Sequence, residues 1–316
     1  EAIIAFKNDH PDIFWIKNTF SYYDYDGSTY VELSFISSGT TLETQKEKFN
    51  EALNDFVNNA TMYSSEYERE KYVNDYIIAN CVYDDEAAYN NNTKGNVSNA
   101  YGVLVDGKAI CEGYARAFQL LCNKLGIECV SIAGMTGDVG HEWNCAKIDG
   151  NWYQVDVTWN DSEDEFSNYY YFNLTDEQMY SSHRADDLFD EIEPDNYNND
   201  ENLIGNLYVP ECNSTEYNYY NQTAPILYAF DEENDNTISN ALANSAVNGD
   251  NYFNIIVDDS LDFEDAYSTL VQDGYVVNYI ESANNMLWGE VELDTSSYAY
   301  KNDTLRVITI VLNYIN

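Results

Sequence analysis

The stretch from residue 141 to residue 159 most constrains the fold of this 316-residue chain. Two β-prone runs, residues 141–148 and 151–159, flank Asp149-Gly150. An Asp-Gly pair between two such runs is a strong signal for a two-residue β-hairpin turn. With that turn Ile148 faces Asn151. Each step away from the turn lowers one residue number and raises the other by one, so this first pair defines all the facing pairs. The sequence therefore predicts both an antiparallel hairpin and its register.

This register brings a histidine and an aspartate together. It places His141 opposite Thr158 and Asp156 opposite Trp143. Side chains alternate between the two faces of a strand, so His141 and Asp156 share a face as diagonal neighbours, with Cα atoms about 7 Å apart. That distance suits an imidazole–carboxylate hydrogen bond. A slip of one residue would put the two side chains on opposite faces.

A cysteine opens the amphipathic helix predicted upstream. Cys111 comes directly before a run with helical spacing of apolar residues, and Gly126 stands where a helix C-terminus favours a left-handed residue. The apolar positions are Tyr114, Ala115, Phe118, Leu121, Cys122 and Leu125. A cysteine in the first turn lies near free N–H groups and partial positive charge, which favour thiolate over thiol.

Together these three residues predict a catalytic triad. Cys111 would be the nucleophile, His141 would take or hold its proton, and Asp156 would fix the imidazole tautomer. Each residue alone is more often structural, but the chain contains only three histidines. His183 is the rival base, and it lacks a carboxylate at a strand-pair spacing, so His141 is preferred.

The motifs around these residues resemble the bacterial transglutaminase-like superfamily. They are Cys-Glu-Gly-Tyr-Ala at 111–115, Gly-His-Glu-Trp-Asn at 140–144 and Trp-Tyr-Gln-Val-Asp-Val-Thr-Trp at 152–159. The resemblance covers about residues 65–185. It implies an α+β, papain-like core, in which a helix bearing the cysteine packs on an antiparallel sheet bearing histidine and aspartate. It leaves the reaction open, because relatives include amide cross-linkers, peptidases and inactive members.

Further site residues are predicted with alternatives. An acyl-transfer site needs donors for the developing oxyanion, and the backbone N–H of Cys111 is one. By family position Tyr101 is the first candidate for the second donor, and Asn99 is the second candidate. Trp143 and Trp159 flank the hairpin, where they either wall the cleft or pack in the core.

Composition narrows the partners. The chain has 14 Lys plus Arg against 56 Asp plus Glu, a net charge of −42. Such a surface repels nucleic acid and anionic membranes. A peptide or protein substrate is what the family resemblance implies. The six cysteines are not paired at metal-binding spacings, so we expect no metal and no cofactor. No run is long and apolar enough to span a membrane.

Changes in pattern along the chain predict three parts. Residues 1–62 form an N-terminal α+β lead-in, residues 63–200 the catalytic core, and residues 201–316 an α+β accessory domain. The accessory domain is expected to recognise the substrate or a cell-surface partner. The acidic, Tyr- and Asn-rich composition favours a secreted or cell-surface protein.

The sequence therefore predicts a secreted cysteine enzyme that attacks peptide or glutamine carboxamide bonds through a thioester acyl-enzyme. Because lysine is scarce, self-cross-linking is disfavoured and hydrolysis is slightly preferred over transfer to an amine. The alternative is a non-catalytic binding or scaffold protein that has kept the fold.

Overall fold

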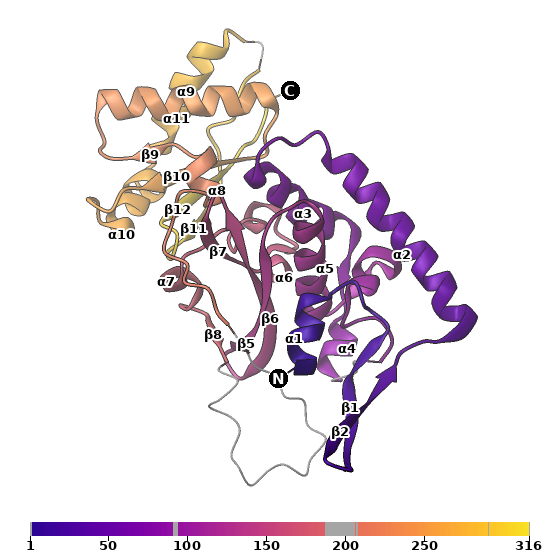
Figure 1. Ribbon diagram of the computed structural model, residues 1–316. Helices are drawn as coiled ribbons and strands as arrows, with labels where there is room; N and C mark the ends of the chain where they lie inside the picture. The colour runs from indigo at the N-terminus through magenta and orange to yellow at the C-terminus, as the bar shows by residue number, and fades with distance from the viewer. Residues whose placement is uncertain (1, 91–93, 187–205, 207, 290, 316) are drawn as a thin grey trace. The chain divides into compact units, whose positions relative to one another are not determined.

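The computed structural model describes all residues except 1, 91–93, 187–205, 207, 290 and 316 (Figure 1). The chain forms two compact units. The first contains residues 1–163 and 171–214, and the second contains residues 164–170 and 215–316. The predicted lead-in, residues 1–62, falls within the first unit. The predicted boundary at residue 200 lies outside the described residues.

The first unit is built around a four-stranded antiparallel sheet in the order β7-β6-β5-β8. Its strands are β5 (Cys129–Thr136), β6 (Val139–Ile148), β7 (Asn151–Val155) and β8 (His183–Ala185). Within the β6–β7 hairpin Ile148 pairs with Asn151 and Asn144 pairs with Val155, as the Asp-Gly turn predicts. Asp149 and Gly150 both have positive φ, at 46° and 91°, which such a turn requires.

Helix α5 (Cys111–Lys124) packs against this sheet, as the apolar spacing of its residues predicts. Phe118 and Leu121 are fully buried, and Gly126 takes the left-handed conformation just after the helix. The other helices and strands of this unit surround this pair. They are α1 (Ala2–Asp9), β1 (Ile16–Tyr25), β2 (Ser28–Phe35), α2 (Gly39–Ala60), α3 (Glu66–Asn80), β3 (Val82–Tyr83), α4 (Asp85–Tyr89), the π-helical turn η1 (Gly102–Asp106), β4 (Lys108–Ala109), α6 (Val157–Asn160) and α7 (Asp176–Met179).

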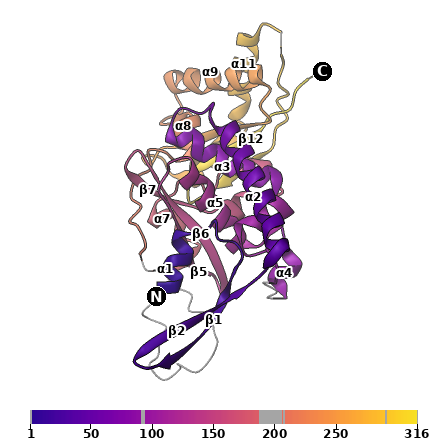
Figure 2. The ribbon, with the colours of Figure 1, turned by 45° about the vertical axis from the view of Figure 1, so that its right-hand side comes forward.

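The β1–β2 hairpin projects beyond the helices of the first unit (Figure 2). Its turn is Asp26-Gly27, again with two positive φ angles. Tyr23 and Tyr30 stack across the strands with ring centroids 5.3 Å apart, and both rings are largely exposed. Cross-strand aromatic pairing thus supports a hairpin that buries little of its own surface.

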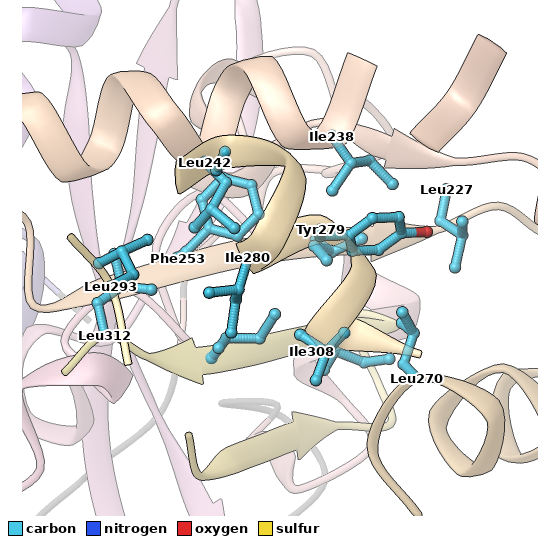
Figure 3. Packing of buried hydrophobic residues seen from close by; sticks show 14 of the residues in the cluster. Leu227, Ile238, Leu242, Phe253, Leu270, Tyr279, Ile280, Leu293, Ile308 and Leu312 are labelled. Atoms are coloured by element: carbon cyan, nitrogen blue, oxygen red, sulfur yellow. The ribbon is translucent and has the colours of Figure 1, made fainter. Parts of the chain in front are cut away.

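The second unit has its own sheet, in the order β11-β12-β10-β9, and its own core. Figure 3 shows this core, in which Leu242 of α9, Phe253 of β10 and Ile280 of α11 meet. Its elements are the 3-10 turn η2 (Glu165–Ser167), α8 (Tyr219–Thr223), β9 (Ile226–Leu227), α9 (Glu232–Asn248), β10 (Tyr252–Val257), α10 (Phe263–Tyr267), the π-helical turn η3 (Ser268–Gln272), α11 (Val276–Leu287), β11 (Ala299–Asn302) and β12 (Val307–Val311). Among the described residues, no helix combines the length and apolar character needed to cross a bilayer.

A buried carboxyl group behind the sheet makes the stability of the first unit depend on pH. Glu70 of α3 is fully buried and accepts a 2.7 Å hydrogen bond from the amide of Asn173. Burial outweighs this bond and raises the pKa of Glu70 from 4.5 to about 8. The folded state therefore holds a proton that the unfolded chain releases, and its stability falls as the pH rises from about 4.5 towards 8.

Replacing Glu70 by glutamine should remove this dependence, because the amide is neutral at every pH and can still accept from Asn173. From pH 6 to pH 8 the free energy of unfolding of the wild type should fall by about 2 kcal/mol more than that of the variant. Urea unfolding at both pH values measures this difference. Glu51→Gln, at an exposed position of α2, is the matched control and should show no such difference from the wild type. An equal pH dependence in wild type and Glu70→Gln would contradict the prediction.

Candidate active site

The sulfur of Cys111 lies at the start of a long helix. Cys111 is the first residue of α5, and the residue before it, Ile110, is in an extended conformation and provides no side-chain cap. The side chain of Cys111 is partly exposed, whereas the other five cysteines are buried. A partly exposed sulfur at the positive end of a helix dipole suits a nucleophile.

His141 joins this sulfur to a carboxylate. Its Nε2 lies 2.7 Å from Oδ2 of Asp156, which leaves Nδ1 available to Cys111. Burial lowers the pKa of His141, but the charge of Asp156, its hydrogen bond and the interaction with Cys111 outweigh burial and raise the pKa to about 10. The imidazole is therefore held in its protonated form near neutral pH.

The structure corrects one part of the predicted hairpin. Strand β7 ends at Val155, and Asp156 is the N-cap of α6, where its Oδ1 accepts from the backbone N–H groups of Thr158 at 3.0 Å and Trp159 at 3.2 Å. Thr158 therefore lies in a helix and does not pair with His141, whose strand partner is Gly134. The prediction failed because the carboxylate stabilises a helix start, which ends the strand. The contact between His141 and Asp156 nevertheless forms.

A second histidine shares the carboxylate. His183 opens β8, which pairs with β5, and its Nε2 lies 3.1 Å from the same Oδ2 of Asp156. Its Nδ1 lies 2.8 Å from the hydroxyl of Ser182, and its side chain is fully buried. His183 has no carboxylate at a strand-pair spacing in the sequence, yet it contacts the same carboxylate as His141. No local spacing could reveal this contact, because it depends on a strand pairing between distant segments.

Four hydrogen bonds thus fix Asp156. Burial raises the pKa of Asp156, but the charge and hydrogen bond of His141, with those of His183, outweigh it and hold the pKa below its usual range. One possible ligand atom from each of His141, Asp156 and His183 lies within 4.8 Å of the other two, so this cluster could also hold a metal ion. Its hydrogen bonds account for the geometry by themselves.

The two tryptophans have different positions. Trp143 is 1% exposed, donates a 2.7 Å hydrogen bond from Nε1 to Gln154 and packs behind the histidines, so it belongs to the core. Trp159 is half-buried, and its ring centroid lies 5.8 Å from that of His141 and 4.6 Å from that of His183. Of the two, only Trp159 is placed to border a cleft at the imidazole.

The candidate for the second oxyanion donor also changes. The ring of Tyr101 packs against Phe14 and Phe49, at 4.8 and 6.1 Å between centroids, and 4% of the residue is exposed. The side chain of Asn99 donates to the backbone carbonyl of Phe14. Tyr83 of β3 is instead close enough to Cys111 for the backbone and the side chain of that cysteine to influence the pKa of its hydroxyl. Burial, followed by the charge of Cys111, raises the pKa of Tyr83 to about 12, so its hydroxyl stays a donor.

Comparison with known proteins finds similarity in the part of the chain that carries this site. Residues 54–157 match the sequence profile of the transglutaminase-like superfamily. The chain is 28% identical over 167 residues to the mouse (Mus musculus) kyphoscoliosis peptidase, covering 49% of this chain and 24% of that protein. It is 30% identical over 69 residues to the human (Homo sapiens) kyphoscoliosis peptidase, covering 18% of this chain and 10% of that protein. The aligned parts therefore span a quarter or less of these relatives.

The chain also matches a solved crystal structure of a TGase. The match covers 49% of this chain and 47% of the TGase chain, with 18% sequence identity and a TM-score of 0.33. Together with the motifs, the profile match shows that residues 54–157 form a transglutaminase-like domain. The predicted α+β fold class is confirmed.

His183 should contribute less than His141 to the reactivity of Cys111. His183→Ala removes one of the two imidazole donors to Oδ2 and leaves a cavity, so we expect Cys111 to react with iodoacetamide about tenfold more slowly at pH 7. His183→Gln retains an N–H donor and should recover most of the rate. Mass spectrometry of labelled Cys111 measures both rates. Equal loss in the two variants would contradict a positioning role for the hydrogen bond.

Proposed function

We propose that this chain is a cysteine-nucleophile enzyme that transfers acyl groups from peptide or carboxamide substrates. One observation carries the proposal: Cys111, at a helix start, is close enough to His141 to raise its pKa, and Nε2 of His141 is hydrogen-bonded to a buried Asp156. This is the arrangement of a nucleophile, an acid–base group and the group that orients it.

The reaction follows from these positions. The Cys111 thiolate attacks the substrate carbonyl carbon, and the carbonyl electrons move to oxygen to give a tetrahedral oxyanion. The backbone N–H of Cys111 and the hydroxyl of Tyr83 are the proposed donors to that oxygen. When the C–N bond breaks, His141 gives its proton to the leaving ammonia or amine and a thioester remains. His141 then takes a proton from water or from a second amine as that group attacks the thioester.

Hydrolysis is the preferred outcome. The two curated relatives are called peptidases, and lysine, the usual amine donor in protein cross-linking, is scarce in this chain. We also propose a peptide or protein substrate and a secreted or cell-surface location, on the basis of the acidic, Tyr- and Asn-rich composition. The second unit is the proposed site for a cell-surface partner. The alternative is a binding or scaffold protein that uses the exposed tyrosines of the β1–β2 hairpin.

A single incubation separates these outcomes. The protein is mixed with unfolded casein and a fluorescent primary amine, with Cys111→Ala as the control. We expect new casein fragments or released ammonia with the wild type and neither with the variant. Fluorescent casein instead of fragments would identify amine transfer. No change in casein, together with an unreactive Cys111, would overturn the enzyme proposal and favour a scaffold.

A further inference from the structure

Two cysteines outside the catalytic cluster face each other in the core of the first unit. Cys145 of β6 and Cys212 are both fully buried, and their sulfur atoms lie 3.9 Å apart. They are 67 residues apart in the sequence, so no spacing motif indicates this approach. The segment that carries Cys212, residues 208–214, is called here the return segment.

The return segment is anchored independently of the sulfur atoms. The N–H of Cys212 donates to Oδ2 of Asp176 at 3.0 Å, and the carbonyl of Cys212 accepts from the N–H of Asp176 at 2.8 Å. Two residues further on, Ser214 accepts a 2.8 Å hydrogen bond from the hydroxyl of Tyr153 on β7. These bonds hold the backbone of Cys212 against the sheet whether or not the sulfur atoms are joined.

Cys145 is fixed in the same network. Its sulfur lies 3.3 Å from Oε1 of Gln154, and the amide nitrogen of Gln154 donates to Asp176 at 2.8 Å. The same Asp176 therefore orients both cysteines, Cys212 directly and Cys145 through Gln154. A disulfide has an S–S distance of about 2.05 Å, so the sulfur atoms must approach by about 2 Å while their backbones stay anchored.

We propose that Cys145 and Cys212 form a disulfide bond when the chain folds under oxidising conditions. The two S–H bonds break and one S–S bond forms. The two electrons and two protons pass to a small-molecule disulfide such as oxidised glutathione, which becomes two thiols. The bond closes a large loop and ties the return segment covalently to β6. This inference does not depend on catalysis, since neither sulfur contacts the residues assigned to the reaction.

Burial determines when the bond forms. It raises the pKa of Cys145 well above the ordinary value for a thiol, so the thiolate is scarce in the folded state. Oxidation is therefore expected during folding or refolding, and the completed bond should be protected from small reductants. Cys111 is partly exposed and lies outside this network, so it takes no part in this bond.

The test is a cysteine map of the full chain. The protein is refolded from urea in a mixture of reduced and oxidised glutathione, alkylated without reduction, and cleaved with trypsin and a Glu-specific protease. These cuts isolate Cys145 on residues 143–147 and Cys212 on residues 212–216, and they put every other cysteine on a separate fragment. We expect these two fragments to be joined and to separate on reduction.

Thermal unfolding gives a second readout. The oxidised wild type should unfold about 10 °C higher than its reduced form, because the bond restricts a long loop in the unfolded chain. Cys212→Ser should show no difference between the two conditions. Alkylation of both fragments would overturn the proposal. If the variant fails to fold, the fragment map of the wild type still decides the question.

Discussion

Replacing Asp156 by asparagine should slow the alkylation of Cys111 at pH 7 by about 10- to 30-fold while leaving the fold intact, because an ordinary thiol with a pKa of about 8.5 still keeps about 3% thiolate at that pH. The Thr158 and Trp159 N–H groups require an acceptor, so the amide oxygen must take the place of Oδ1. The amide nitrogen then replaces Oδ2 and donates towards His141 and His183. Each Nε2 must become an acceptor, so each imidazole is neutral and carries its one proton on Nδ1.

This tautomer disables the base. Nδ1 of His141 then carries a proton towards Cys111 and cannot accept another from its thiol. Nδ1 of His183 can still donate to the Ser182 hydroxyl, so that contact survives. Iodoacetamide labelling at pH 7 measures the rate and circular dichroism the fold. Asp161→Asn is the matched control, because its side chain only accepts from Tyr114 and an amide can do the same. A rate within threefold of the wild type would contradict the role given to Asp156.

Replacing Gly134 by alanine should destabilise the first unit by at least about 3 kcal/mol. A Cβ on Gly134 would lie 2.1 Å from the backbone oxygen of Arg184 and 2.6 Å from the ring of Trp143. The oxygen belongs to β8 and the ring is fully buried, so neither can move without opening the sheet. Because β8 carries His183, the same displacement should also weaken the histidine cluster.

Gly140→Ala is the matched control on the neighbouring strand. A Cβ on Gly140 has no atom within 4 Å, and this position is exposed. We expect thermal unfolding of Gly134→Ala to shift down by about 6 to 12 °C and that of Gly140→Ala to change little. Equal unfolding midpoints for the two variants would contradict the close contact between Gly134 of β5 and the backbone of Arg184 on β8.

Local patterns predicted the part of the fold that depends on neighbours in sequence. The Asp-Gly turn and strand alternation set the β6–β7 register, and helical spacing set α5 with Cys111 at its start. The same alternation was misleading at Asp156, because residues 155–159 still alternate as a strand would. Only the hydrogen bonds to the carboxylate turn that segment into a helix.

The rest of the site depends on pairings between distant segments. His183 reaches Asp156 because β8 pairs with β5, and Tyr83 reaches Cys111 because the two-residue strand β3 pairs with β4. Strands of two or three residues carry too little periodicity to be identified in a sequence. The prediction of Tyr101 rested on family position, and the aromatic packing of this chain places that ring elsewhere.

The central claim is that an imidazole held by Asp156 keeps the sulfur of Cys111 reactive. The most direct measurement is the rate of Cys111 alkylation from pH 5 to pH 9 in the wild type and in His141→Ala. An ordinary thiol, with a pKa of about 8.5, is almost entirely protonated at pH 6 and reacts slowly there. We predict that at pH 6 Cys111 is alkylated much faster in the wild type than in His141→Ala, because the variant lacks the imidazole whose pKa Asp156 raises. Identical pH profiles for the two proteins, each rising only above pH 8, would contradict the account.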